Sequence, residues 1–373
     1  MSEENEATGP DGPDEAGTAP EGVRLEKERS LALPAHVADI DLGDGSLLAA
    51  CQDGGIYEVD LDDDSRRELG RHESFASGVH RIPGSGTVVS AGYDGKLKWI
   101  EAAGAKVTRE VVAHEFWSWQ SALSPDGSKL ATVTGRYAVG GLDYAPAPES
   151  EPSVKVFDVA SGALVRALPH VPPVESVAFS RDGRLVAAGN LMGEVRVWDV
   201  GDGQEVARIS TDSFTGWGVI KGHYYTGGVF ALAFAPGDES ILLAGMGSTR
   251  DPAAGNGKQL WEHFALKDGA PEKSASASDG DIGQGLMETL AWHPTDRFFL
   301  MAGRLFKGDW NVALFDASSG TRLHMENSGM RVSKAVFDPA GERVYVAGGT
   351  GQSKGDDGTF PEWGRVDVFR VQC

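Results

Sequence analysis

The residue patterns that commonly mark catalytic sites are missing from this sequence of 373 residues. It contains no GxSxG nucleophile motif, no HExxH zinc-binding pair and no CxxC motif. The glycine-rich strings at Gly348 to Gly355 and at Gly255 to Lys258 lack the GxxxxGK(S/T) spacing of a phosphate-binding loop, and the first precedes a predicted strand instead of a helix. We therefore expect a protein that is not an enzyme and that uses no cofactor and no metal.

Aromatic and arginine side chains gather instead in glycine-rich segments between the apolar runs. Trp, Tyr and Arg are enriched among the residues that carry most of the binding energy at protein interfaces. This pattern favours a non-catalytic scaffold or interaction module that binds a protein or peptide. Any one ring could instead pack inside its own loop, because long loops need small cores of their own. The candidate partner-binding residues are Trp117, Trp119, Trp217, Tyr224, Phe230, Arg304 and Trp310.

The elements that must position these residues repeat along the chain. SPDGSKLATVTG, SRDGRLVAAGN and DPAGERVYVAGG each predict strand, tight turn, strand, since Gly accepts a positive φ at the turn and the flanking apolar residues alternate. Four weaker copies make seven, and each is followed by another alternating strand. The intervals from Val59 to Ile100 and from Phe157 to Trp198 are both 41 residues, the length of one propeller blade. The large residues of these following strands are Val59, Ile100, Phe157, Trp198, Phe264, Phe315 and Phe369.

The segment from His170 through VESVAFSRDGRLVAAG to EVRVWD resembles one WD40 repeat, from its leading His to its closing Trp-Asp. The resemblance covers residues 23–373 and implies an all-β fold, a seven-bladed β-propeller of four-stranded antiparallel blades. Residues 23–33 resemble the fourth strand of a blade, so the N-terminal strand should pair with the last blade and close the ring. We expect residues 1–22 to be a disordered acidic tail and residues 23–373 to be the propeller.

The resemblance also implies a network of His, Ser or Thr, Asp and Trp inside each blade, which this sequence keeps only in part. Blade 2 has His72, Ser90 and Asp94 but Ile100 at the Trp position, because Trp99 comes one residue early. Blade 4 has the leading His and the Trp without their polar partners. The fold should therefore depend mainly on apolar packing. We interpret His72, His114 and His170 as structural residues and Asp158, Asp199 and Asp316 as turn residues.

The extra length of the chain falls in only two kinds of connection. The connection between the second and third strands, named bc, is long in blades 3, 5, 6 and 7, and the connection from one blade to the next, named da, is long before blades 5 and 6. In an antiparallel blade both kinds open on the same face of the disc. Because loops on a rigid scaffold commonly carry function, we predict that this bc/da face binds the partner.

By register, Trp119 corresponds to positions that should surround the mouth of the central channel: Ala38, Gly78, Glu175, Phe230, Glu288 and Ser333. Two alternatives remain open at this mouth. Glu175 and Glu288, with Glu115 and Asp143 nearby, could hold a metal or a small substrate, as in a metal-dependent hydrolase-type propeller. Trp117 and Trp119 could instead form the aromatic cage of a small-ligand sensor.

Composition limits the class of partner. The formal net charge is −21, and Met1 to Gly22 contributes seven acidic residues and no basic ones. Such an acidic chain argues against a surface that coats nucleic acid or an anionic membrane. The sequence has no secretory signal, no apolar run long enough to span a membrane, and only Cys51 and Cys373 as cysteines. We therefore expect a cytoplasmic protein that is monomeric by itself.

Overall fold

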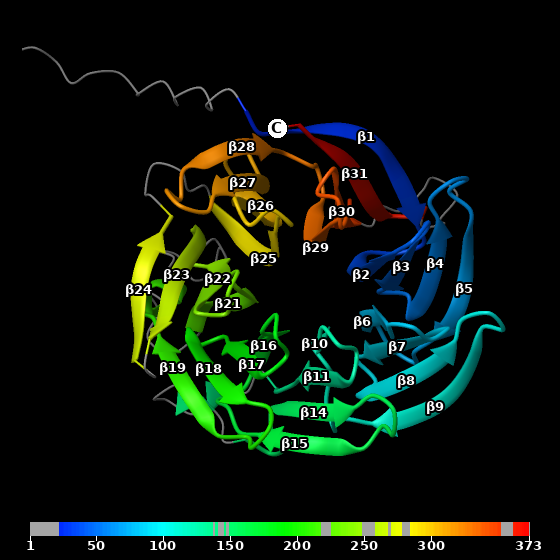
Figure 1. Ribbon diagram of the computed structural model, residues 1–373, viewed down its shortest axis with the longest axis horizontal. Coiled ribbons are helices and arrows are strands. Elements are labelled where there is room, and N and C mark those ends of the chain that lie inside the picture. Colours follow the sequence, from blue (N-terminus) through cyan, green and yellow to red (C-terminus); the bar gives the residue numbers. More distant parts are fainter. Residues whose placement is uncertain are drawn as a thin grey trace, which may run out of the picture.

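The strands form a ring of seven sheets around a central channel (Figure 1). This computed structural model describes residues 22–136, 139–140, 145–146, 149–217, 225–247, 258–267, 270–277, 284–351 and 361–372. Each sheet is one blade of antiparallel strands, which we name a to d from the channel outward. The expected seven-bladed propeller is confirmed. Residues 1–21 of the expected acidic tail lie outside the described residues, so that expectation stays a prediction.

The first four blades follow the same strand order. Blade 1 contains β2 (Val37–Gly43), β3 (Ser46–Cys51), β4 (Gly55–Asp60) and β5 (Arg66–Arg71). Blade 2 contains β6 (Ala76–Arg81), β7 (Thr87–Gly92), β8 (Lys96–Glu101) and β9 (Lys106–Val112). Blade 3 contains β10 (Gln120–Leu123), β11 (Lys129–Val133), β14 (Val154–Asp158) and β15 (Leu164–Leu168), with the short pair β12 (Val139–Gly140) and β13 (Ala145–Pro146) in its bc connection. Blade 4 contains β16 (Val174–Phe179), β17 (Leu185–Asn190), β18 (Glu194–Asp199) and β19 (Glu205–Ser210).

The last three blades carry most of the added strand length. Blade 5 contains β21 (Tyr225–Phe234), β22 (Ser240–Met246), β23 (Gln259–Lys267) and β24 (Ala270–Ser276), and the 3-10 turn η1 (Asp212–Phe214) leads into an extra strand, β20 (Thr215–Trp217), that pairs with β21. Blade 6 contains β25 (Gln284–Trp292), β26 (Phe298–Lys307), β27 (Val312–Asp316) and β28 (Arg322–Glu326). Blade 7 contains β29 (Arg331–Phe337), β30 (Arg343–Gly349), β31 (Gly364–Gln372) and, as its strand d, β1 (Arg24–Leu33).

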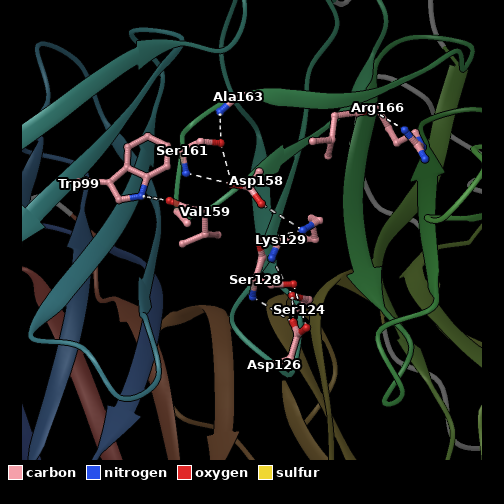
Figure 2. Close-up of polar contacts among 12 residues, drawn as sticks. Trp99, Ser124, Asp126, Ser128, Lys129, Asp158, Val159, Ser161, Ala163 and Arg166 are labelled. Atoms are coloured by element: carbon pink, nitrogen blue, oxygen red, sulfur yellow. Dashed lines mark hydrogen bonds and ion pairs between the residues drawn. The ribbon is translucent and has the colours of Figure 1, made fainter.

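Strand c of every blade carries its large residue at the same register. Each of these residues pairs with the second residue of strand b, and each is buried. They are Val59, Ile100, Phe157, Trp198, Phe264, Phe315 and Phe369. The expected assignment of these seven positions is therefore confirmed. Trp99, one residue before Ile100, points to the other side of its sheet, where its Nε1 donates a hydrogen bond to the Val159 carbonyl of the next blade at 2.9 Å (Figure 2).

Apolar side chains form seven clusters, one between each pair of adjacent blades. The cluster between blades 7 and 1, for example, joins Leu31 and Leu33 of β1 with Val37, Leu47 and Val366. Each sheet therefore buries both of its faces, because alternate side chains of one strand pack into the clusters on its two sides. The expectation that apolar packing carries the fold agrees with this arrangement, and polar networks supplement it.

One such network joins the connection that enters blade 2 to strand β7 and to the connection that follows it. His72 lies at 2.9 Å from Asp94 through Nδ1 and at 2.9 Å from the Ser90 hydroxyl through Nε2, and the ring is buried. These contacts of His72 with Asp94 and Ser90 are the ones that the resemblance to a WD40 repeat implied. The predicted role of acids at turns is also confirmed, since Asp158 accepts hydrogen bonds from the Ser161 amide and hydroxyl at 2.9 and 2.6 Å (Figure 2).

The ring closes through the strands nearest the two ends of the chain. β1 pairs with β31 along its whole length, with Arg24 opposite Gln372 and Leu33 opposite Gly364 (Figure 1). Leu31 and Leu33 are 2 and 0 % exposed, so this strand also fills the cluster between blades 7 and 1. The predicted closure by the N-terminal strand is confirmed.

Replacing Leu33 with Ala should lower the free energy of unfolding by about 2 to 5 kcal/mol, because it leaves a cavity in a cluster that holds the ring closed. Urea denaturation followed by tryptophan fluorescence measures this loss. Ala32→Ser is the matched control, since Ala32 is exposed on the same strand and its replacement should change stability by less than about 0.5 kcal/mol. Equal stability of Leu33→Ala and wild type would contradict the assigned closure.

Candidate functional site

A β-bulge near the start of strand a directs one residue per blade to the channel mouth. The extra residues are Ala38, Ser77, Glu175, Phe230, Glu288 and Ser333, and Trp119 occupies the equivalent place just before β10. A bulge leaves one residue outside the ladder and re-aims its side chain. The expected positions are therefore correct in six blades. In blade 2 the prediction was wrong by one residue, because Gly78 pairs with Ala91 and Ser77 is the bulged residue.

Three aromatic rings from two blades form a stack beside this mouth. The ring of Trp117 lies between those of Phe116 and Tyr93, with centroids 4.8 and 4.9 Å away and interplanar angles of 14° and 8°. Trp119 meets the edges of Trp117 and Tyr93 at 5.2 and 5.3 Å, and Phe75 approaches Tyr93 at 5.6 Å. We call Phe75, Tyr93, Phe116, Trp117 and Trp119 the ring cluster. Its members hold one another in place, as offset and edge-on aromatic contacts do.

The central ring of the cluster, Trp117, exposes its edge and not a free ring face. Trp117 is 41 % exposed and Phe75 44 % exposed, although both faces of Trp117 are covered by its neighbours. Trp119 is half-buried, packs against the apolar cluster of blades 3 and 4, and donates its Nε1 hydrogen bond to the Gly135 carbonyl at 2.9 Å. Arg136 lies over Phe116, with its guanidinium carbon 5.3 Å from the ring centre. The result is a rigid apolar surface with a cation at its border.

Two carboxylates and an arginine lie next to the ring cluster. Arg331 donates hydrogen bonds through Nε and Nη2 to both carboxylate oxygens of Glu288, with an Nε to Oε2 distance of 2.9 Å. Burial and the nearby charge of Glu288 raise the pKa of Glu175 to about 8. Burial and the charge of Glu175 also raise the pKa of Tyr93. The structure thus brings Glu175 and Glu288 together, as expected, and pairs only Glu288 with a counter-charge.

The remaining predicted residues have different environments. Phe230 is half-buried at its bulge, and Arg304 is exposed on β26 with its guanidinium carbon 4.9 Å from the Phe306 ring. Trp310 is 3 % exposed and belongs to the core between blades 5 and 6, where Phe315 lies 6.0 Å away. Tyr224 and the side chain of Trp217 lie outside the described residues, as does Asp143. The structure therefore gathers Trp117 and Trp119 at one place and leaves Arg304 and Trp310 apart from them.

Three residues of this site were not anticipated from sequence: Phe75, Tyr93 and Arg331. Phe75 lies in the da connection before blade 2, and Tyr93 directly follows β7. Both connections have the ordinary length, so a search for insertions passes over them. Their place on bc/da connections next to the mouth positions is the signal that could have found them.

Deeper in the channel, a serine, a histidine and an aspartate lie close together without forming a catalytic triad. His80 Nε2 is 2.9 Å from the Ser121 hydroxyl and 4.0 Å from Asp39 Oδ2. A triad needs the serine and the acid on opposite ring nitrogens, whereas here both approach the same one. Asp39 also accepts a hydrogen bond from the Val79 amide at 3.1 Å and lies 3.0 Å from the Lys334 ammonium. The group therefore links blades 1, 2, 3 and 7 instead of activating a nucleophile.

Comparison with known proteins agrees with this architecture. The family profile described as "WD domain, G-beta repeat" matches residues 162–199, which contain β15 and the first three strands of blade 4. WD repeat-containing protein SL1-17 of Schistosoma mansoni is 29 % identical over 124 residues, which make up 33 % of this chain and 36 % of that protein. The chain is a WD40-repeat β-propeller.

Other relatives of this WD40 propeller are larger proteins. Human WD repeat-containing protein 90 is 29 % identical over 175 residues, 44 % of this chain and 9 % of that protein. The U3 small nucleolar RNA-associated protein 15 homolog of Xenopus tropicalis is 26 % identical over 237 residues, 54 % of this chain and 42 % of that protein. The chain thus spans less than half the length of these curated relatives.

The described residues of the WD40 propeller contain no helix long and apolar enough to cross a membrane. In the same part of the chain, no three His, Cys, Asp or Glu side chains are grouped so that they could hold a metal ion. Glu175 and Glu288 therefore stand at the mouth as two carboxylates without a described third acidic or histidine partner.

The raised pKa of Glu175 predicts how stability depends on pH. The folded protein keeps this carboxyl protonated up to about pH 8, whereas the unfolded chain ionises near the ordinary value of 4.5. The contribution of Glu175 to stability is therefore complete below pH 4.5 and is lost as pH rises through 8. Glu175→Gln, which cannot ionise, should match wild type at pH 5 and exceed it at pH 9 by about 1 to 3 kcal/mol, each pKa unit being worth about 1.4 kcal/mol.

Urea denaturation of both proteins at pH 5, 7 and 9 measures this difference. Glu101→Gln is the control, because Glu101 is an exposed carboxylate at the end of β8 and its replacement should give no gain at pH 9. A difference between Glu175→Gln and wild type that stays constant from pH 5 to 9 would show that Glu175 has an ordinary pKa.

Proposed function

We propose that this WD40 propeller is a non-catalytic interaction module that binds a protein or peptide through its bc/da face, with the ring cluster as the main contact. The relatives named above are WD-repeat proteins, which supports an interaction role in general terms. The choice of face is carried by one observation: the large exposed aromatic residues in the described part of the chain, Phe75, Trp117 and Phe306, all lie on bc or da connections or at the strand ends that lead into them.

The other exposed large apolar residues differ in type and place. Val107, Val112, Leu164, Val206 and Met325 are aliphatic and lie on the outer strands β9, β15, β19 and β28. Aliphatic residues scattered singly over a surface are normal. Contiguous aromatic surface with an arginine at its border is typical of the centre of a protein interface. The ring cluster with Arg136 fits that description, and the outer strands do not.

The geometry of the ring cluster favours a macromolecular partner over a caged small cation. A cation–π site needs an open ring face, whereas Phe116 and Tyr93 cover both faces of Trp117. A protein surface can instead cover the exposed edges of Trp117 and Phe75 together. The half-buried Glu175 would then contact a polar or basic group of the same partner at the border of the cluster.

Partner capture tests this proposal with variants that separate the two surfaces. Immobilised wild type, Trp117→Ala and Leu164→Ala are exposed to the same lysate, and the proteins recovered are quantified by mass spectrometry. Partners bound specifically by wild type should fall at least tenfold with Trp117→Ala, because an interface anchor is worth about 2 kcal/mol or more. They should be retained by Leu164→Ala, which removes a side chain that is 50 % exposed on an outer strand.

Cooperative thermal unfolding at an unchanged temperature first establishes that both variants fold. Equal recovery by wild type and Trp117→Ala would refute the ring cluster as the contact. Loss with Leu164→Ala alone would place the contact on the outer strands.

A further inference from the structure

At four junctions between blades, an arginine on strand d of one blade reaches the strand c to strand d turn of the next. Arg29 of blade 7 donates to the Leu61 carbonyl at 2.6 Å, and Arg67 of blade 1 donates to the Ala102 carbonyl at 2.9 Å. Arg109 of blade 2 donates to the Ala160 carbonyl at 2.8 Å, and Arg166 of blade 3 donates to the Gly201 carbonyl. Figure 2 shows Arg166 on β15, the strand that follows the Asp158 to Ala163 turn of blade 3.

These arginines occupy one equivalent position in their blades. Each pairs with the residue that precedes the large residue of strand c: Arg29 with Val368, Arg67 with Glu58, Arg109 with Trp99 and Arg166 with Val156. In blade 4 the residue at this position is Ala207, opposite Val197. The repeated bridge is therefore absent at the junction of blades 4 and 5.

The other two junctions have their own arrangements. Between blades 5 and 6 the Trp261 ring covers the turn of blade 6, so closely that a side chain at Gly320 would meet the ring at 2.8 Å. Between blades 6 and 7 no turn of this kind exists, because strands c and d of blade 7 are β31 and β1. Among the described residues, the junction after blade 4 is therefore the one where the next blade has such a turn but strand d sends no arginine to it and no aromatic ring covers it.

A groove of about 1070 Å³ opens at this junction, on the left of the ring in Figure 1 between β19 and β23. Val206 and Ala207 line it on the side of blade 4, and Leu266 and Lys267 line it on the side of blade 5. Leu266 follows Phe264 as Leu61 follows Val59, so its backbone corresponds to the site that Arg29 reaches. The groove therefore lies where the missing side chain would be.

We propose that this groove binds an arginine side chain from an extended segment of a protein partner. The exposed Val206 and the neighbouring Leu266 provide apolar surface for the aliphatic part of the side chain. The guanidinium then reaches the backbone at Leu266, as the four arginines of the chain reach the equivalent turns at their junctions. The exposed Glu239 supplies negative charge beside it.

The charges around the groove suit one added cation. Four carboxylates and three basic side chains line it. Of the basic ones, Arg181 is held by Asp296 at 2.7 Å, and Arg184, with 70 % of its side chain exposed, lies 4.0 Å from Asp199. The site lies on the face opposite the ring cluster, so it stands independently of the function proposed above.

A peptide copied from the chain itself tests the site. Acetyl-LVRALP-amide reproduces residues 164–169 around Arg166, and the same peptide with citrulline in place of arginine keeps the shape but removes the charge. Titration into full-length protein labelled at its methyl groups should shift the signals of Val206, Ala207 and Leu266 in a saturable way. The citrulline peptide should bind at least fivefold more weakly.

Three variants keep the test decisive. Ala207 is 6 % exposed at the edge of the apolar cluster between blades 4 and 5, so Ala207→Arg places the chain's own arginine in the groove and should abolish the saturable shift. Ala167→Arg, a change to arginine at an exposed alanine of β15, should leave it intact. Glu239→Lys, a surface change that leaves packing unaltered, should weaken binding at least threefold and serves if Ala207→Arg does not fold. Absence of a saturable shift, equal binding of the citrulline peptide, or full binding by folded Ala207→Arg would overturn the proposal.

Discussion

The constraint on which the whole molecule depends is that each sheet must bury both of its faces against neighbouring sheets. The seven apolar clusters satisfy it, because each lies between two blades and none lies at the centre of the ring. No blade can bury its residues alone, so stability is shared between neighbours. The ring must also close, since an open end would expose a sheet face such as that of Val37 and Leu47.

Because the apolar core lies between the blades, the inner surface of the ring is free to be polar. Strand a of each blade uses this freedom in two ways. Side chains such as Asp39 and Gln120 accept hydrogen bonds from the backbone of the next blade and join neighbours along the channel. The bulged residues at the start of the strand, such as Glu175, Glu288 and Phe230, are not paired in the sheet and face the mouth. Burial there raises the pKa of Glu175, so this unpaired carboxyl stays protonated near neutral pH.

Sequence alone predicted what depends on local patterning, and it failed where contacts between distant residues decide. The large residue of strand c and the closing strand follow from spacing and residue type, the His72 network was implied by the resemblance to a WD40 repeat, and all three were correct. Ser77 was missed because Ala76, Ser77 and Gly78 are all small, so nothing in their size shows which one the bulge displaces. The stack of Trp117 on Tyr93 joins two blades, and the burial of Trp310 depends on blades 5 and 6 together. The bridging arginines become recognisable only once the strands are in register.

The pairing of β1 with β31 has a consequence for the time at which the molecule can form during synthesis. β1 is made before every other strand of the ring and its partner β31 after all of them, since Arg24 lies opposite Gln372. Blades 1 to 6 can assemble one after another as the chain lengthens, but the first strand must wait, with Leu31 and Leu33 uncovered, until the last one arrives. Interactions between residues so far apart in sequence form slowly, and apolar surface left exposed in the interval invites aggregation. We expect a nascent chain of this protein to depend on chaperones that shield β1 until β31 has been made.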